Sequence, residues 1–252
     1  MKTPYLGVHQ TGSSSNGDSL AAVKTVFGWA AQNLKVPSNP AEGVRVATGK
    51  RRTEGKLPYA NEEAKRILLA SRKEAGLLRW VPWLEGLSGA RVSEVVECFV
   101  SDVRETEGIH YLNIEADADM GKSTKTASSD RLVPLHPAVI AEGFLEYVAS
   151  LPKDGPLFPD VTPDKYGRRG ANGSRTVARW VRGKVGLTDD RKAPNHAWRH
   201  WFISQCRAVG VPEEARDRIV GQKNAKASEG RNYGEYDLRV LRDEVAKVKS
   251  PV

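Results

Sequence analysis

The sequence predicts an α+β domain that is mainly helical and carries a small antiparallel sheet. Three observations lead to this prediction. Apolar residues recur at helical spacing in most segments between residues 18 and 248. Two short segments alternate like strands, and the polar residues between them include a glycine suited to a turn. The chain contains no internal repeat that would indicate a solenoid.

The composition is that of a globular protein, with 39% hydrophobic and 28% charged residues in a chain of 252. No run of about 18 apolar residues is present, so no membrane span is expected. The first residues lack the apolar core of a signal peptide. Cys98 and Cys206 provide neither a disulfide framework nor a CxxC metal pair, and this usage fits a reducing cytoplasm.

The chain is basic, with 39 Lys and Arg residues against 31 Asp and Glu residues and a formal net charge of +8. A basic surface favours a polyanionic partner, because each neutralised phosphate releases condensed counterions. This charge excess indicates a class of partner and does not by itself identify one.

The N-terminal part is expected to be separate from the rest. Residues 1–17 are polar and loose, and a helix is predicted from Asp18 or Ser19 up to Pro37. Its apolar face would consist of Leu20, Val23, Phe27, Ala30, Ala31 and Leu34. We therefore expect a short helical piece over 1–46, a basic linker over 47–55 and the main domain over 56–252.

The main domain is expected to begin with three helices. Asn61 can cap the first helix, which would run to about Lys73 and bury Ala64, Ile67 and Leu68. The second helix would contain Pro82 at a kink. Ser88 and Gly89 would end it, and a third helix would span Arg91–Phe99.

Strands are predicted at 111–114 and 131–133, with a polar turn region between them. Helices are then predicted at about 137–149, 174–184, 196–208, 212–219 and 238–248. The apolar face of the last helix could pack on its own domain or dock on a neighbouring subunit.

Two short motifs combine cationic side chains in a way that suits an anionic ligand. Arg91 opens a helix, whose N-terminal N–H groups favour anions, and Glu94 one turn later could orient it. His196 and Arg199 are three residues apart, so their Cβ atoms lie on one helical face about 5–6 Å apart. His196 and His200 also have zinc-like spacing, but Ala197 replaces a metalloprotease glutamate and no third ligand stands out, so no metal is expected.

The order of these motifs resembles the tyrosine recombinase (phage integrase) family. The resemblance rests on Arg-x-Ser-Glu at 91–94, His-x-x-Arg at 196–199 and Tyr-Gly at 233–234, and it covers nearly everything from Leu20 onward. It implies the integrase catalytic fold with a shortened N-terminal DNA-clamping domain. It further implies a catalytic set drawn from Arg91, Lys125, His196, Arg199, Gln222 and Tyr233.

Within this resemblance, Lys125 precedes the Arg-x-Val-Pro-Leu strand at 131–135 and would protonate the leaving 5′ oxygen. The turn length also permits Lys122 in this role. A segment rich in glycine and basic residues at Lys165–Arg175 could contact phosphates that position the DNA without specifying its sequence. A solvated loop is an equally good interpretation of each of these basic residues.

The nucleophile implied by the resemblance is Tyr233, and Tyr236 is its competitor three residues later. Gln222 follows Val220 and Gly221, where the family has a histidine or sometimes a tryptophan. A glutamine donates hydrogen bonds but carries no charge and shuttles no proton. This departure affects the expected catalytic efficiency more than the expected fold.

The activity implied by the resemblance is site-specific cleavage and rejoining of double-stranded DNA through a 3′-phosphotyrosine, in a tetramer and without a cofactor. Two alternatives stay open. A type IB topoisomerase-like enzyme would use the same chemistry without synapsis. A catalytically weakened DNA-binding protein would be consistent with Gln222 and the short N-terminal region.

Overall fold

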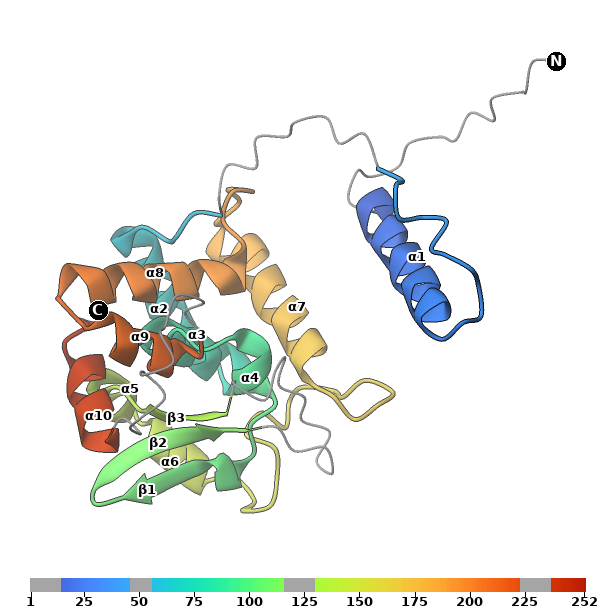
Figure 1. Cartoon of the computed structure of the whole chain (residues 1–252). Coiled ribbons are helices and arrows are strands. Elements are labelled where there is room, and N and C mark those ends of the chain that lie inside the picture. Colours follow the sequence, from blue (N-terminus) through green and yellow to red (C-terminus); the bar gives the residue numbers. More distant parts are fainter. Residues whose placement is uncertain (1–14, 46–55, 116–129, 223–236) are drawn as a thin grey trace. The chain divides into compact units, whose positions relative to one another are not determined.

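The computed structural model describes residues 15–45, 56–115, 130–222 and 237–252. The chain divides into two compact units, Met1–Thr53 and Glu54–Val252 (Figure 1).

The described part of the first unit contains the helix α1 (Ser15–Gln32). This helix begins before Asp18, where we expected its start, and it ends before Leu34, whose φ of 54° is left-handed. Leu34 is 92% exposed and follows the last helical residue, so its predicted place on the helix is wrong. Asn39 Nδ2 donates to the Lys24 carbonyl at 3.0 Å and ties the following turn to the helix.

The second unit begins with α2 (Asn61–Ser71), in which Ala64, Ile67 and Leu68 are fully buried as predicted. The predicted cap is wrong, because the Ala60 N–H donates to Glu63 Oε2 at 2.7 Å at this helix start. Asn61 Oδ1 accepts instead from Trp201 Nε1 at 2.8 Å. The asparagine therefore joins α2 to a distant helix.

The helix α3 (Gly76–Ser88) contains Pro82 and ends at Gly89, whose φ of 65° is left-handed. The sequence predicted both features. The next helix, α4 (Val92–Val96), is shorter than the expected 91–99. Arg91 is the N-cap residue of α4 and has an extended backbone, so its side chain lies at the N-terminal end of this helix.

A three-stranded antiparallel sheet follows, in the order β1-β2-β3. A 3-10 turn (Val100–Asp102) leads into β1 (Val103–Thr106), which pairs with β2 (Ile109–Ile114). Leu112 of β2 lies opposite Val103 on one side and Val133 of β3 (Arg131–Pro134) on the other. The predicted strands at 111–114 and 131–133 are confirmed, and β1 was not predicted.

The predicted helix at 137–149 is divided into α5 (Pro137–Ala141) and α6 (Phe144–Ala149) by Gly143, whose φ is 90°. The helix expected at 174–184 begins earlier, as α7 (Gly170–Trp180), and continues as a π-helical turn over Val181–Val185. The remaining helices are α8 (Pro194–Ala208), α9 (Glu213–Val220) and α10 (Leu238–Ala246).

The core of the second unit lies between these helices and the sheet. In Figure 1, α8 crosses one side of the unit and the sheet lies on the other. The helices α3 and α8 pack on each other, and Trp198, Trp201 and Phe202 of α8 are buried. A Cβ atom on Gly86 of α3 would lie 3.0 Å from the Trp198 ring, so the glycine permits this close packing.

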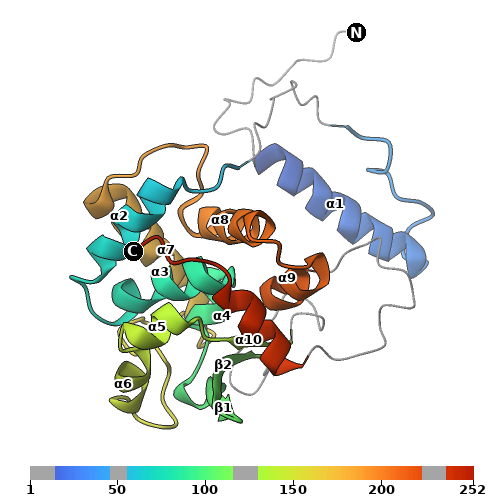
Figure 2. The same ribbon diagram turned by 90° about the vertical axis from the view of Figure 1, so that its left-hand side faces the viewer.

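The terminal helix α10 packs on its own domain. Leu241, Val245 and Val248 are buried, and α10 contacts β2, β3 and α9. Figure 2 shows α10 between α9 and β2. The Val248 carbonyl lies 2.6 Å from His136 Nε2, which holds the segment after α10 beside the start of α5. Of the two packing alternatives, the described helix adopts the one within its own domain.

Candidate active site

Two arginines from separate elements meet at the C-terminal end of α9. Arg199, on α8, donates from Nη1 to the Gly89 carbonyl at 2.9 Å and also to the Val220 carbonyl. Arg91, at the start of α4, makes a weak contact of 3.5 Å from Nη2 to the Gly221 carbonyl. The structure therefore brings together the two arginines that the sequence placed far apart.

Glu94 orients Arg91. Its Oε1 lies 2.6 Å from Arg91 Nη1, and its Oε2 accepts the Arg91 backbone N–H at 3.0 Å. The Arg91 side chain is 34% exposed, whereas that of Glu94 is 7% exposed. The carboxylate is thus a fixed, buried partner, and one side of the Arg91 guanidinium stays open to a ligand.

Arg131, at the start of β3, is a third arginine of this cluster, and its place in the site was not predicted from the sequence. Its Nη2 lies 2.8 Å from Glu94 Oε2, and its Nε donates to the Ile219 carbonyl at 2.9 Å. Its side chain is 1% exposed. A charged residue at the start of an apolar strand was the available signal, because a buried charge requires a partner.

The histidine and the arginine of the His-x-x-Arg motif have different environments. Arg199 is buried, and this burial, together with Arg91 and Arg131, lowers the pKa of its guanidinium to about 10, so it stays cationic at neutral pH. His196 is exposed, and its ring lies 4.5 Å from that of His200. Partial desolvation, His200 and the two arginines lower the pKa of His196 below its ordinary 6.5. A neutral imidazole can accept a proton.

Gln222 follows the left-handed Gly221, which caps α9 with a φ of 64°. Its N–H donates to the Asp217 carbonyl at 2.9 Å, and its side chain is exposed. Gln222 is therefore adjacent in sequence to the carbonyls that bind Arg91 and Arg199.

The other predicted residues lie outside the described part of the chain. Lys125 and its alternative Lys122 fall within residues 116–129, and Tyr233 and its competitor Tyr236 fall within 223–236. The first segment connects β2 to β3, and the second follows Gln222. Their roles remain predictions.

The segment Lys165–Arg175 contains a loop held by two carboxylates. Asp164 Oδ1 accepts the Arg168 N–H at 2.9 Å, and backbone N–H groups lower the pKa of this aspartate. Glu97, which follows α4, accepts the Gly170 N–H at 2.6 Å. The loop is thus attached to the helix that Arg91 begins. The exposed basic side chains of the whole segment are Lys165, Arg168 and Arg175, and Tyr166 is exposed among them.

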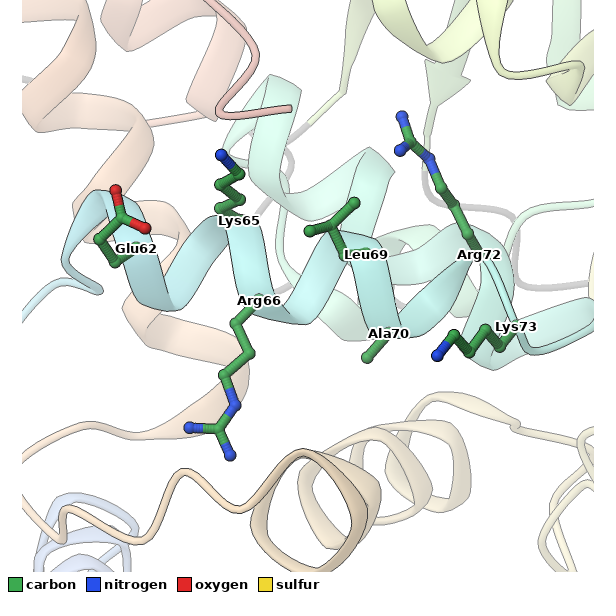
Figure 3. Close-up of a pocket in the computed structure, with 7 residues that line it drawn as sticks. All are labelled: Glu62, Lys65, Arg66, Leu69, Ala70, Arg72 and Lys73. Carbon is green, nitrogen blue, oxygen red and sulfur yellow. The ribbon is translucent and has the colours of Figure 1, made fainter.

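A separate pocket of about 710 Å³ lies along α2. Figure 3 shows its side chains, with Lys65 and Arg66 on opposite sides of the helix. Arg72 pairs with Glu142 at 2.6 Å, and Arg66 donates to the Val185 carbonyl. The pocket contains none of the residues predicted to carry chemistry, so its polar groups are interpreted as structural.

Among the described residues, no group of three or more His, Cys, Asp or Glu side chains is placed to hold a metal ion. In the same part of the chain, no helix is long and apolar enough to cross a membrane.

The chain is similar to known proteins in its structure but not detectably in its sequence. No protein-family model matches the sequence, and no curated protein matches it. The structure resembles the integrase of mycobacterium phage Brujita, with a TM-score of 0.55 and 17% identity, over 96% of this chain and 74% of that one. It also resembles the Tn1549 transposon integrase in complex with a circular intermediate DNA, with a TM-score of 0.60 and 16% identity, over 95% and 80% of the two chains.

The chain has the tyrosine recombinase fold. A lambda integrase dimer bound to a core site is a further similar structure, with a TM-score of 0.54 and 17% identity, over 87% of this chain and 74% of that one. At these identities the likeness establishes the fold. The predicted α+β catalytic fold, mainly helical with a small antiparallel sheet, is confirmed.

Proposed function

We propose that this protein is a site-specific DNA recombinase that cleaves and rejoins DNA through a 3′-phosphotyrosine intermediate. The convergence of Arg91 and Arg199 on the carbonyls at 220–221 carries this proposal. Two guanidinium groups from separate elements suit the non-bridging oxygens of one phosphodiester. The recombinase fold supports the same activity, since similar structures are of integrases bound to DNA.

In the proposed reaction, the Tyr233 oxygen attacks the scissile phosphorus, and the bond from phosphorus to the 5′ oxygen breaks. Arg91 and Arg199 stabilise the negative charge that develops on the non-bridging oxygens. The neutral His196 accepts the phenol proton, and Lys125, or Lys122 in its place, protonates the leaving 5′ oxygen. The ester bond energy is retained in the phosphotyrosine, so rejoining needs no ATP.

The proposed partner is double-stranded DNA, with a tetramer formed across two DNA sites. The exposed cations of the Lys165–Arg175 segment would contact phosphates beside the scissile one, since Glu97 attaches this segment to α4. Such contacts position a duplex without reading its sequence. Binding should accordingly weaken as salt increases.

Gln222 favours a second candidate function, a DNA-binding protein with weakened catalysis. Its exposed amide donates a hydrogen bond but adds no positive charge beside the arginines. This candidate predicts specific DNA binding with little or no covalent product. A type IB topoisomerase-like activity would give the covalent product without junctions between two duplexes.

The test is incubation with nicked suicide duplexes that carry candidate attachment sequences from the flanking genome, followed by denaturing electrophoresis. The proposal predicts a protein–DNA band that is lost in Tyr233→Phe and kept in Tyr236→Phe. Loss only in Tyr236→Phe would assign the nucleophile to Tyr236. DNA binding without any band would support the weakened binder, and junction formation would separate a recombinase from a topoisomerase.

A further inference from the structure

Arg131 connects three elements of the candidate active site through one buried guanidinium. It begins β3, its Nη2 lies 2.8 Å from Glu94 Oε2 in α4, and its Nε donates 2.9 Å to the Ile219 carbonyl in α9. Its side chain is 1% exposed. A buried charge with fixed hydrogen bonds in two directions holds its partners at a set separation.

The Arg131 guanidinium also lies directly against Gly221. A Cβ atom added to Gly221 would be 2.6 Å from Arg131 Nη1. The turn formed by Val220 and Gly221 supplies the carbonyls that bind Arg199 and Arg91. The position of Arg131 thus determines where this turn lies, and with it where both phosphate-binding arginines are held.

Arg131 also determines which hydrogen bonds the two carboxylate oxygens of Glu94 accept. Glu94 Oε2 is shared between Arg131 Nη2 and the Arg91 backbone N–H, so only Oε1 bonds the Arg91 guanidinium, at 2.6 Å. Without Arg131, Oε2 would be available for a second bond to that guanidinium. A bidentate pair would neutralise Arg91 more completely and turn its donors away from a phosphate.

We propose that Arg131 is a positioning residue that keeps the Arg91 guanidinium available to the scissile phosphate and holds the 220–221 turn in place. This inference rests on the proposed recombinase function. Arg131 itself is too buried to touch the substrate, so its effect is transmitted through Glu94, Arg91 and Gly221.

The first experiment measures single-turnover formation of the covalent adduct by full-length Arg131→Gln and Arg131→Lys on a nicked duplex. We expect Arg131→Gln to be about 10- to 100-fold slower than the unsubstituted protein, with a DNA dissociation constant within about 3-fold. Arg131→Lys should be intermediate, because it keeps the charge and loses the planar fork. Arg79→Lys, which alters a largely buried Arg–Glu pair away from the cluster, is the matched control and should change the rate less than about 2-fold.

A second substrate separates positioning from folding. A methylphosphonate at the scissile position lacks the charged non-bridging oxygen, so the Arg91 charge matters less there. The rate defect of Arg131→Gln should therefore shrink to a few-fold on this substrate. In addition, Glu94→Gln/Arg131→Gln should cleave the ordinary substrate faster than Arg131→Gln alone, because no carboxylate remains to neutralise Arg91. A merely structural role predicts equal defects on both substrates and a double variant no better than the single one, and either result would overturn the inference.

A binding measurement distinguishes failure of this inference from failure of the proposed function. In the Tyr233→Phe background, the ratio of affinities for phosphodiester and methylphosphonate duplexes reports the Arg91 charge without cleavage. The inference predicts that Arg131→Gln reduces this ratio several-fold. If the unsubstituted protein forms no adduct and the ratio still falls, the recombinase proposal fails while the positioning of Arg91 stands. An unchanged ratio would overturn the positioning role.

Discussion

Replacing Glu94 by alanine is expected to lower the free energy of unfolding by about 3–5 kcal/mol, the usual cost of removing one partner of a buried ion pair. The Glu94 carboxylate lies 2.8 Å from Arg131, whose side chain is 1% exposed, and 2.6 Å from Arg91, whose side chain is 34% exposed. The more exposed Arg91 pair should contribute about 1 kcal/mol or less, because solvent screens it. Most of the loss therefore arises from leaving Arg131 buried without this carboxylate.

The loss of stability in Glu94→Ala should become smaller at acidic pH. Burial alone raises the pKa of Glu94, but Arg131 and Arg91 outweigh burial, so the net shift lowers the pKa below its ordinary 4.5. A carboxylate with a lowered folded-state pKa stabilises the fold above its unfolded-state pKa, and this contribution is lost as pH falls through the folded-state value. The stability difference from the Glu94→Ala variant should accordingly be full near pH 7 and shrink below about pH 4.

Urea unfolding followed by circular dichroism at pH 7 and at several lower pH values measures this difference. Glu105→Ala is the control, because the side chain of Glu105 is 56% exposed, and its change should stay within about 0.5 kcal/mol. A loss below about 1 kcal/mol for Glu94→Ala at pH 7 would refute the argument that Glu94 compensates a buried charge. A loss that is the same at pH 7 and pH 3 would refute the electrostatic origin.

Three further predictions concern other residues of the second unit. Glu85 is fully buried, neither of its carboxylate oxygens has a hydrogen-bond partner among the described residues, and burial raises its pKa well above 4.5. Above about pH 4.3 the Glu85 carboxyl ionises readily only in the unfolded chain, so the fold loses stability as pH rises. Glu85→Gln should therefore raise the free energy of unfolding at pH 7, measured by urea unfolding, by about 1–3 kcal/mol. An unchanged free energy of unfolding would contradict this prediction. Gly221→Ala should lower the free energy of unfolding by about 1–3 kcal/mol more than Gly210→Ala does. Both glycines have a left-handed φ, but only Gly221 lies against Arg131. Equal losses for the two variants would show that this contact does not affect stability. Because the pKa of His196 lies below 6.5, adduct formation should decline as pH falls through that lowered value, and His196→Asn should remove this limb of the pH–rate profile; an unchanged limb would assign it to another group.

The sequence predicted the helices best where burial alone determines them. Ile67 and Leu68 of α2, and Leu241 and Val245 of α10, are buried as their spacing indicated, since an apolar face must pack against the core. Helix boundaries were less accurate where distant contacts decide them. Asn61 bonds Trp201 of α8, and no local pattern distinguishes that contact from a cap.

The strand β1 was not predicted because its side chains lack an alternating apolar pattern. Arg104, Glu105 and Thr106 are all exposed, and the strand is specified by its pairing with β2. A strand that pairs at the edge of a sheet and buries little leaves a weak signal in the sequence.

In the candidate site, too, local pairs could be predicted from the sequence, whereas contacts between distant residues could not. Arg91 with Glu94, and His196 with Arg199, are pairs within one turn of a helix, so their spacing indicated that each pair lies on one helical face. The contribution of Arg131 depends on Glu94 and Ile219, which come from other elements of the fold. Only the tertiary structure brings these groups together.

The most direct test of the proposed function is identification of the residue that carries DNA in a trapped adduct. The adduct formed on a nicked duplex is digested with nuclease and trypsin, and the peptide is fragmented in a mass spectrometer. Cleavage after Arg231 and Arg239 places Tyr233 and Tyr236 in one peptide, so fragment ions between them are needed. We predict a nucleotide 3′-phosphate on Tyr233. Modification of Tyr236 would contradict the assignment of Tyr233 as the nucleophile. Specific DNA binding without any adduct would contradict the proposed recombinase activity.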